Sequence, residues 1–419
     1  MNHWKYGMSI ATAALLAAMG ASAREGASPF TVSNSLHVEF DDNMDQTAND
    51  RIDGFKVSDQ VTLSLQQKLE QGFLGVSYQL IATWWEPRDD EEFTFDHIVD
   101  ATVDHKFSPS IGGMVQNKFI RRDSPELVNA DGTVKREDSS YDWNSLNVSV
   151  SLNPTSSSRL DLAGRWQLLQ FEDASVADRE DYEAYSVGAT LVSQTSPETA
   201  LLLEVRGERF DYPGAGKVVG SDLVLPGAAA GAGDRRTIPD RAFDNLIGGI
   251  GVEQKFNPNL SGRVMAGYML KDLKAANSSD ESSPYVEGSL TLNPSPATTI
   301  TLMGTYSLYQ SGLLTYATQE RTAASLSVGH DLTPRFSVYV AGSYANSDYQ
   351  NANSVDTVPE AQVQNASEDV LVFSARGVYR LDPSRRHSLE AGWSYTDLSS
   401  DLREEFDRNR YDVAWRIQL

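Results

Sequence analysis

The chain has 419 residues, with 58 Asp and Glu against 35 Lys and Arg, a formal net charge of −23 and no cysteine. The acidity argues against a nucleic-acid partner, because binding to phosphates requires a basic face. Without cysteine, disulfides and thiolate metal sites are excluded. A helical membrane protein is excluded as well, because it would need repeated apolar runs of roughly 18 or more residues. The length allows either several domains or one large all-β domain.

The N-terminus predicts export from the cytoplasm. Lys5 precedes an apolar stretch over residues 8–19, and Ala21, Ser22 and Ala23 provide the small residues of a cleavage site. A cation, a short apolar core and small residues in this order are typical of a secretory signal peptide. We therefore expect residues 1–23 to be a signal peptide and residues 24–419 to form one folded unit.

Apolar and polar residues alternate through most of the remaining sequence. In the first segment, Leu36, Val38 and Phe40 are separated by His37 and Glu39. Alternation with a period of two is the pattern of a β-strand with one apolar face, because successive side chains point to opposite faces. No stretch shows a convincing helical period, so the sequence predicts an all-β fold.

Eighteen segments show this pattern. Most are 10–14 residues long, whereas strands of soluble proteins usually have about 5–6 residues. A tilted strand that crosses a bilayer needs about 9–11 residues. The segments span residues 30–41, 55–67, 73–85, 93–107, 111–122, 143–152, 158–171, 183–193, 200–212, 243–256, 260–271, 284–292, 298–310, 319–332, 336–346, 369–381, 387–397 and 409–419.

The connections between these segments alternate in length. Every connection after an even-numbered segment has 3–6 residues, and every connection after an odd-numbered one has 7–30. Short periplasmic turns and long extracellular loops are characteristic of outer-membrane barrels. We therefore expect one closed antiparallel transmembrane β-barrel of about 18 strands (16–18) in the bacterial outer membrane. Aromatic residues near the strand ends predict an interfacial girdle at each end of the barrel. They are Trp84, Trp85, Phe93, Phe95, Phe171, Phe210, Tyr212 and Phe243 on the loop side and Phe73, Phe107, Phe256 and Phe336 on the turn side.

The short connections share a proline motif. Seven of the eight contain Asn, Asp, Ser or Thr followed by proline, as in Ser108-Pro109, Asn153-Pro154 and Asn293-Pro294. Proline fixes φ for the first central residue of a turn, and the preceding polar side chain can bond to its own backbone. The motif predicts that each of these prolines lies at the centre of a tight turn.

These turns and strands resemble the putative β-barrel porin type 2 family. The matching pieces are the residues after Phe40 and the motifs around Pro154, Pro294 and Pro334. Members of that family are often associated with exopolysaccharide production and export. The resemblance implies a pore that passes small hydrophilic solutes or secreted polysaccharide, and it carries no catalytic residues. In addition, the segment from Tyr411 to Leu419 resembles the C-terminal signal that the outer-membrane insertion machinery reads.

Alternation also assigns charged residues to the inner face of the barrel. Charges of opposite sign around a pore select among ions and solutes, although on a polar wall they can equally serve only to pair with neighbouring strands. Asp96, Asp100 and Asp104 share one face of one segment and could form an acidic ladder opposite Lys118 and Arg122. The lumen-lining candidates are Asp96, Asp100, Asp104, Lys118, Arg122, Arg165, Arg206, Lys255, Arg263, Arg376, Arg380, Arg410 and Arg416.

Two alternatives remain for the long connection 213–242. It could fold into the lumen as a constriction, or it could be a mobile exterior loop, which its glycine-rich composition favours. For the whole chain, the alternatives to an open channel are a plugged structural barrel that anchors an export apparatus and a β-solenoid outside the membrane. We expect no enzyme: the sequence offers no catalytic, cofactor-binding or metal-ligating set.

The acidity of the chain is concentrated in the long connections. They contain 34 Asp and Glu against 12 Lys and Arg, so the rest of the sequence is nearly neutral. We expect an acidic extracellular rim that contacts outer-membrane lipid and lipopolysaccharide, with divalent cations as possible bridges at residues 89–92. The sequence does not fix the oligomeric state or the solute.

Overall fold

The computed structural model describes residues 29–86, 93–123, 126–128, 134–136, 139–219, 236–238, 240–274, 280–311, 316–352, 366–383, 386–402 and 404–419. The expected signal peptide (1–23), the acidic cluster at 89–92 and the middle of the connection 213–242 lie outside these residues. Among the described residues, no helix is both long and apolar enough to cross a membrane.

Eighteen antiparallel strands form one sheet that closes on itself. The strand order follows the chain, and the first strand pairs with the last, from Ser33 opposite Gln418 to Asp41 opposite Arg410. The strands are β1 (Phe30–Asp41), β2 (Gly54–Leu69), β3 (Gly72–Trp85), β4 (Phe93–Ser108), β5 (Ile111–Arg122), β8 (Tyr141–Thr155), β9 (Ser158–Phe171), β10 (Tyr182–Gln194), β11 (Thr199–Asp211), β14 (Phe243–Asn257), β15 (Leu260–Leu273), β16 (Glu281–Ser295), β17 (Thr298–Gln310), β18 (Tyr316–Thr333), β19 (Phe336–Ala352), β20 (Ser367–Arg380), β21 (His387–Ser400) and β22 (Phe406–Gln418).

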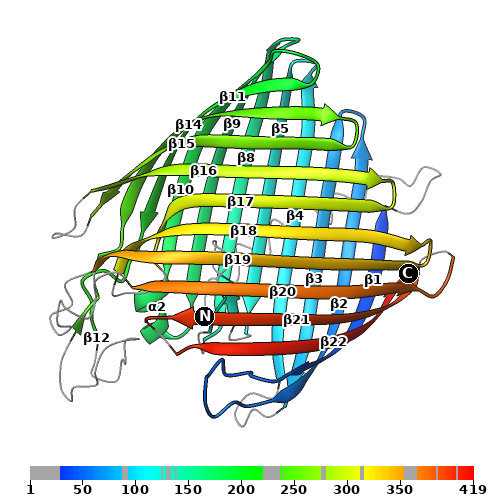
Figure 1. Ribbon diagram of the computed structural model, residues 1–419, viewed down its shortest axis with the longest axis vertical. Coiled ribbons are helices and arrows are strands. Elements are labelled where there is room, and N and C mark those ends of the chain that lie inside the picture. Colours follow the sequence, from blue (N-terminus) through cyan, green and yellow to red (C-terminus); the bar gives the residue numbers. More distant parts are fainter. Residues whose placement is uncertain are drawn as a thin grey trace.

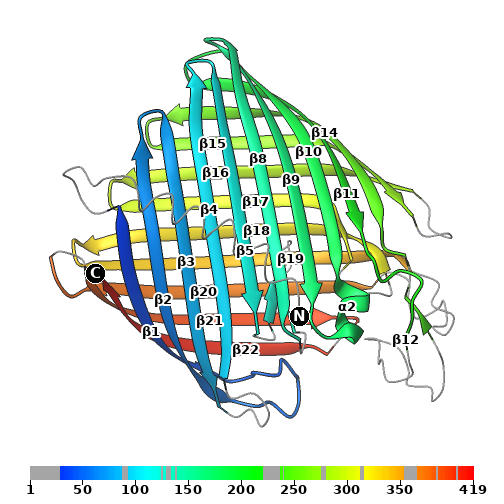
Figure 2. The ribbon, with the colours of Figure 1, turned by 180° about the vertical axis from the view of Figure 1, so that it is seen from behind.

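The predicted fold class is confirmed: each of the eighteen predicted segments overlaps one of these strands. The strands are strongly tilted, so the wall formed by β1–β9 crosses the wall formed by β14–β22 at a large angle (Figures 1 and 2). Tilted strands are required to close a sheet into a barrel. The start of β1 and the C-terminus lie at the same end of the barrel, where the N–H of Leu419 donates to the carbonyl of Val32 (2.8 Å).

The two faces of each strand meet different surroundings. In β1, Leu36 and Val38 point outward and are 43% and 42% exposed, whereas Ser35 and Asp41 point inward and are 3% and 4% exposed. Directly opposite residues of an antiparallel pair lie on the same face, so the registers carry this assignment from strand to strand. The outer face is mostly apolar, and the inner face holds most of the polar groups.

Eight short turns of two to six residues join the strands at one end. Pro109, Pro258 and Pro334 lie in two-residue turns, but the prediction for Pro154 and Pro294 was wrong. These two prolines lie inside β8 and β16, where the ladder shifts register between Leu152 and Thr155 and in the equivalent position of β16. A proline has no N–H for the ladder and is accommodated at an irregularity of this kind.

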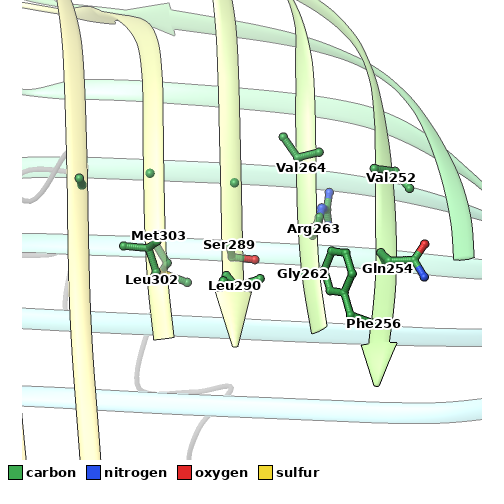
Figure 3. A pocket seen from close by; sticks show the side chains of 13 residues that line it. Val252, Gln254, Phe256, Gly262, Arg263, Val264, Ser289, Leu290, Leu302 and Met303 are labelled. Atoms are coloured by element: carbon green, nitrogen blue, oxygen red, sulfur yellow. The ribbon is translucent and has the colours of Figure 1, made fainter. Parts of the chain in front are cut away.

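A shallow apolar groove of about 470 Å³ crosses the outer face of β14 to β18 (Figure 3). Val252, Val264, Leu290 and Leu302 contribute its walls, and Gly288 lies between them. These residues alternate with inward-pointing neighbours, so the groove belongs to the surface that faces lipid and not to the channel.

The longer connections carry small additional elements. They contain the helix α2 (Ala174–Glu180) and two short hairpins, β6 (Glu126–Val128) with β7 (Val134–Arg136) and β12 (Val218–Val219) with β13 (Arg236–Thr237). In Figures 1 and 2, α2 and β12 lie at the end of the barrel opposite the short turns. We call this end the mouth.

Candidate functional site: the lumen and its mouth

The registers place all thirteen predicted lumen residues on the inner face of the barrel. Ser35 lies opposite Arg416, and Asp41 opposite Arg410, which extends the inward face of β1 to β22. The same reasoning applies around the sheet to Asp96, Asp100, Asp104, Lys118, Arg122, Arg165, Arg206, Lys255, Arg263, Arg376 and Arg380. Eight of them form three groups with other inward charges, Arg410 lines a recess beside the first group, and the remaining four stand apart.

The first group joins β20, β21 and β22. The guanidinium of Arg376 lies 3.1 Å from Oε2 of Glu390 and 3.0 Å from Oδ2 of Asp412. Arg416 approaches the other oxygen of Glu390 at 3.7 Å. The carboxylates are mostly shielded, with side-chain exposures of 8% and 13%, whereas Arg376 is 39% exposed. The arginine is therefore the part of the group that a passing solute meets.

This network depends on a glycine. A Cβ at Gly392 would lie 2.2 Å from Oδ1 of Asp412, so the carboxylate occupies the space that any other residue would fill. Gly392 lies opposite both Arg376 and Asp412 in the two neighbouring ladders. The absent side chain thus lets Asp412 reach across β21 to the arginine on β20.

A recess of about 630 Å³ opens on this part of the inner wall. Arg376, Arg410 and Asp412 line it together with Glu39 and Tyr339. Tyr339 points inward from β19 and is 46% exposed. Beyond Glu39, the ammonium of Lys56 extends the charged surface to β2 at 2.7 Å. The recess therefore combines charges of both signs with an aromatic ring.

The acidic ladder of β4 faces the two cations on β5. Nε of Arg122 lies 3.4 Å from Oδ2 of Asp96. Asp100 lies directly opposite Lys118, and Asp104 lies opposite Met114. Asp104 also lines a second recess of about 440 Å³ close to the short turns. The acidic charge along β4 is thus neutralised at the mouth and left without a cation partner, among the described residues, towards the other end.

The third group runs along β11 and β14 to β16. Arg206 contacts Glu204 and Glu208 of its own strand at 3.4 and 3.1 Å. Arg263 lies 3.6 Å from both Glu253 on β14 and Glu287 on β16. Each arginine therefore sits between two carboxylates, which fixes the guanidinium on the wall.

Four predicted residues are not part of a charge group. Arg165 donates to Oδ1 of Asn147 (3.1 Å), and Arg380 donates to Oγ of Ser337 (3.0 Å). Lys255 and Asp104 make no ion pair among the described residues. They are spread around the barrel, so they contribute to the field in the lumen without forming a site.

The predicted aromatic girdle was wrong for five of its eight loop-side members. On the turn side, Phe107 and Phe256 are 65% and 60% exposed on the outer face, Phe336 points outward and Phe73 points inward. On the loop side, Trp84, Phe93 and Phe95 point outward. Of the other five aromatic side chains, four share a face with inward neighbours in the ladder, and Tyr212, just beyond β11, packs with the inward Phe243. The five are Trp85, Phe171, Phe210, Tyr212 and Phe243. Proximity to a strand end could not separate them from a lipid-facing girdle, whereas the alternation in their own strands could.

These inward aromatic residues build a packed core inside the mouth. Phe171 and Tyr141 pack with Val176 of α2, and all three are at most 6% exposed. The carboxylate of Asp173 caps the helix by accepting from the N–H of Ser175 (2.7 Å). The helix is thus held against the inner wall of β8 and β9, where it narrows the opening.

The base of the connection 213–242 also attaches to α2. Lys217 pairs with Asp178 at 2.5 Å. Arg241 stacks on Tyr212, and its guanidinium donates to the carbonyls of Arg179 (3.1 Å) and Ser311 (2.8 Å). Burial raises the pKa of Tyr212 to about 12. Whether the rest of this connection enters the lumen stays a prediction, because its middle lies outside the described residues.

Two features of the site escaped the sequence reasoning. Lys56 alternates with the apolar Phe55 and Val57 and was recognisable by the same rule as the other inward residues. The helix α2 has only seven residues, too few for a periodic pattern. No group of three or more His, Cys, Asp or Glu residues with metal-binding geometry occurs in the described part of the chain.

Comparison with known proteins identifies the family. Residues 29–419 match the family described as "Putative beta-barrel porin 2". The chain belongs to this family. The resemblance found in the sequence is thereby confirmed, and a porin-like channel of the outer membrane is the function that it indicates. No curated protein matches the chain.

Several solved structures are similar to this chain at low identity, among them the outer membrane protein OpdK. OpdK from Pseudomonas aeruginosa is 11% identical with a TM-score of 0.48, and 93% of this chain and 99% of that one are covered. OpdL from the same organism is 12% identical with a TM-score of 0.47, and 94% of this chain and 99% of that one are covered. OccAB3 from Acinetobacter baumannii is 11% identical with a TM-score of 0.46, and 93% of this chain and 99% of that one are covered.

Proposed function

We propose that this channel conducts small hydrophilic solutes through a water-filled lumen and that its inward charges set a weak selectivity. The observation that carries the proposal is the charge group around Arg376, which places an exposed guanidinium and two shielded carboxylates on the wall of a recess. Fixed charges of both signs across a pore create a transverse field that acts on polar and charged solutes.

Recordings in planar bilayers test this function. We expect discrete conductance steps, with a reversal potential in a salt gradient that moves towards cation selectivity when Lys118 and Arg410 are both changed to Gln. Lys274→Gln is the matched control, because Lys274 lies beyond the end of β15 and pairs with Asp244 and Asp272, which point outward. Equal reversal potentials in both variants would refute a selective role for the inner charges.

The packed mouth favours a second candidate, the plugged structural barrel. Val176, Phe171 and Arg241 occupy space on the inner side of the wall, as a plug would. If the wild type shows no conductance, the plugged barrel replaces the open channel. Passage of secreted polysaccharide stays a prediction from the family resemblance.

We further propose that residues 1–23 direct export and are removed. Insertion would use the segment from Tyr411 to Leu419, in which Tyr411, Val413 and Trp415 point outward and are 43–58% exposed. Contact of the acidic loops with lipopolysaccharide through divalent cations is proposed on charge alone. Mass spectrometry of the mature N-terminus tests the first proposal, and an N-terminus that retains Lys5 would refute it.

A further inference from the structure

The ladder between β16 and β17 stops part-way along both strands. Val286 opposite Tyr306 is its last pair towards the mouth. Both strands continue beyond this pair, β16 to Glu281 and β17 to Gln310, and each stays paired with its other neighbour. Pro284 lies two residues beyond the last pair, and proline is confined to sheet edges because it cannot donate to a ladder. The break is therefore encoded in the sequence.

Beyond the break, the end of the β17–β18 hairpin lies inside the barrel. Near the short turns, the even-numbered residues of β18 point outward, and alternation places Thr318 and Glu320 on this same face. Glu281 and Ser283 lie on the inner face of β16. Thr318 nevertheless donates to Glu281 (2.8 Å), and Ser283 donates to Glu320 (2.9 Å). An outer face thus covers an inner face, and β17 curves away from β16 in Figure 1. We call residues 307–310 and 316–320 the hairpin end.

The hairpin end covers an apolar patch on the inner wall. Leu308 has the outward parity of β17, yet it is only 3% exposed because it packs into this patch. The patch comes from inward residues of β11, β14, β15 and β16 and lies directly behind the break. Its members are Leu202, Ile247, Met265, Met269 and Tyr285.

Buried polar groups without partners destabilise the arrangement in which the hairpin end covers the apolar patch. Asn245, Lys271, Glu281 and Gln310 each have a buried side-chain atom without a hydrogen-bond partner. A buried polar group without a partner destabilises the arrangement that buries it. The contacts of Leu308, Ala317 and Tyr316 with their apolar neighbours and the two side-chain hydrogen bonds to β16 hold the hairpin end, and these unpaired groups act against them.

The break lies at the level of the lipid-facing surface. Tyr268 and Leu270 point outward from β15, directly opposite Pro284 and Ser282, and each is 50% exposed. The outer surface is thus still apolar where the ladder has already ended. On the inner side, the contact of Arg241 with the carbonyl of Ser311 fills the neighbouring part of the mouth.

We propose that the break between β16 and β17 is a lateral portal. The hairpin end swings aside, and an amphipathic molecule with a charged head group and an apolar tail passes between the lumen and the outer leaflet. Its tail takes the place of Leu308 on the apolar patch, while its head group follows the polar lumen. The portal adds a sideways route to the axial channel and rests on the proposed function only in requiring a water-filled lumen.

Cross-linking tests the portal in the intact protein, which contains no cysteine. In the variant with Ser283→Cys and Glu320→Cys, a short bifunctional thiol reagent locks the hairpin end against β16 after folding. The matched control carries Thr291→Cys and Thr301→Cys, which lie directly opposite on the inner faces of the same two strands within the continuous ladder. Heat-modifiable gel migration verifies that both variants are folded.

The readouts separate the two routes. Vesicles containing the protein and trapped albumin receive a fluorescent alkyl sulfonate in the outer leaflet, and its arrival at the albumin is followed beside the ion conductance. We expect cross-linking of the 283–320 pair to reduce arrival at least tenfold, cleavage of the linker to restore it, and the control pair to change nothing. Equal arrival with and without the lock, or arrival no faster than in protein-free vesicles, would overturn the portal. A loss of ion conductance with unchanged arrival of the alkyl sulfonate would instead count against the axial channel and not against the portal.

Discussion

At the scale of single residues, a buried ion pair joins the last strand to the first. The guanidinium of Arg408 binds the carboxylate of Asp41 through Nε (2.9 Å to each oxygen) and through Nη2. Both side chains are about 95% shielded from solvent. Removing one partner of such a pair leaves an uncompensated charge, which costs about 3–5 kcal/mol.

We therefore expect Arg408→Met to lower the unfolding free energy by about 3–5 kcal/mol. The double variant with Asp41→Leu should recover part of this loss, because it buries no lone charge. Urea titration followed by gel migration measures the three midpoints. A double variant less stable than Arg408→Met would show that the charge itself is not the source of the loss.

Asp181, which follows α2, gives the mouth a pH dependence. Burial raises the pKa of Asp181 to about 6, although the N–H of Phe171 donates to its carboxylate (2.8 Å) and Lys217 opposes the shift. A raised pKa in the folded state means that the stabilising contribution is complete below the unfolded pKa near 4. It is lost as the pH rises through 6.

Asp181→Asn should therefore become more stable relative to the wild type as the pH rises from 4 to 8. The amide oxygen of Asn can still accept from Phe171, so only the charge is removed. Thermal midpoints of both proteins across this pH range measure the difference. A difference that stays constant with pH would contradict the assignment to Asp181.

At the scale of secondary-structure elements, α2 depends on its N-cap. Asp173 accepts from the N–H groups of Ser175 (2.7 Å) and Val176 (3.4 Å). Because removal of a capping side chain costs about 1 kcal/mol, Asp173→Ala should increase amide exchange in residues 174–180 several-fold and leave the barrel strands unchanged. Asp173→Asn, which keeps a capping oxygen, is the control. Faster exchange in the control would show that the charge, and not the cap, holds the helix.

The elements also show where sequence reasoning succeeded and where it failed. Strands such as β15 were predictable to within a few residues, because one face meets lipid and the other meets polar groups. Pro154 and Pro294 were misplaced because a proline in a tight turn and a proline in an irregular strand end have the same local sequence. The inward position of Thr318 and Glu320 could not be predicted, because it depends on a ladder that ends between two strands and not on any local pattern.

At the scale of the whole molecule, closure requires every strand. A chain without residues 406–419 would leave β1 and β21 with unpaired edges, and an open sheet edge is not tolerated in a membrane. We expect this variant to lose the heat-modifiable band completely. Deletion of residues 220–235, which removes none of the eighteen barrel strands, should leave the band in place. A heat-modifiable band from the truncated chain would show that closure by β22 is dispensable.

The residues that point to the inner face were more predictable than the contacts between them. All thirteen candidate residues lie on the inner face, because alternation fixes the direction of a side chain. Which charges combine was not predictable, since Arg376 reaches Asp412 across the intervening Gly392, and that approach depends on neighbouring strands. The same limit applies to α2, whose position is decided by the aromatic residues on which it packs.

The pairing of the first strand with the last has a consequence for the order of folding. Asp41 and Arg408 are 367 residues apart in the chain, so their contact cannot form until the final strand is in place. Contacts between distant residues fold slowly, because the entropy of closing a long loop is lost before the contact is gained. During that delay β1 presents an open edge, which invites pairing with other chains. We therefore expect β1 to be the strand most exposed to wrong pairing until β22 closes the barrel.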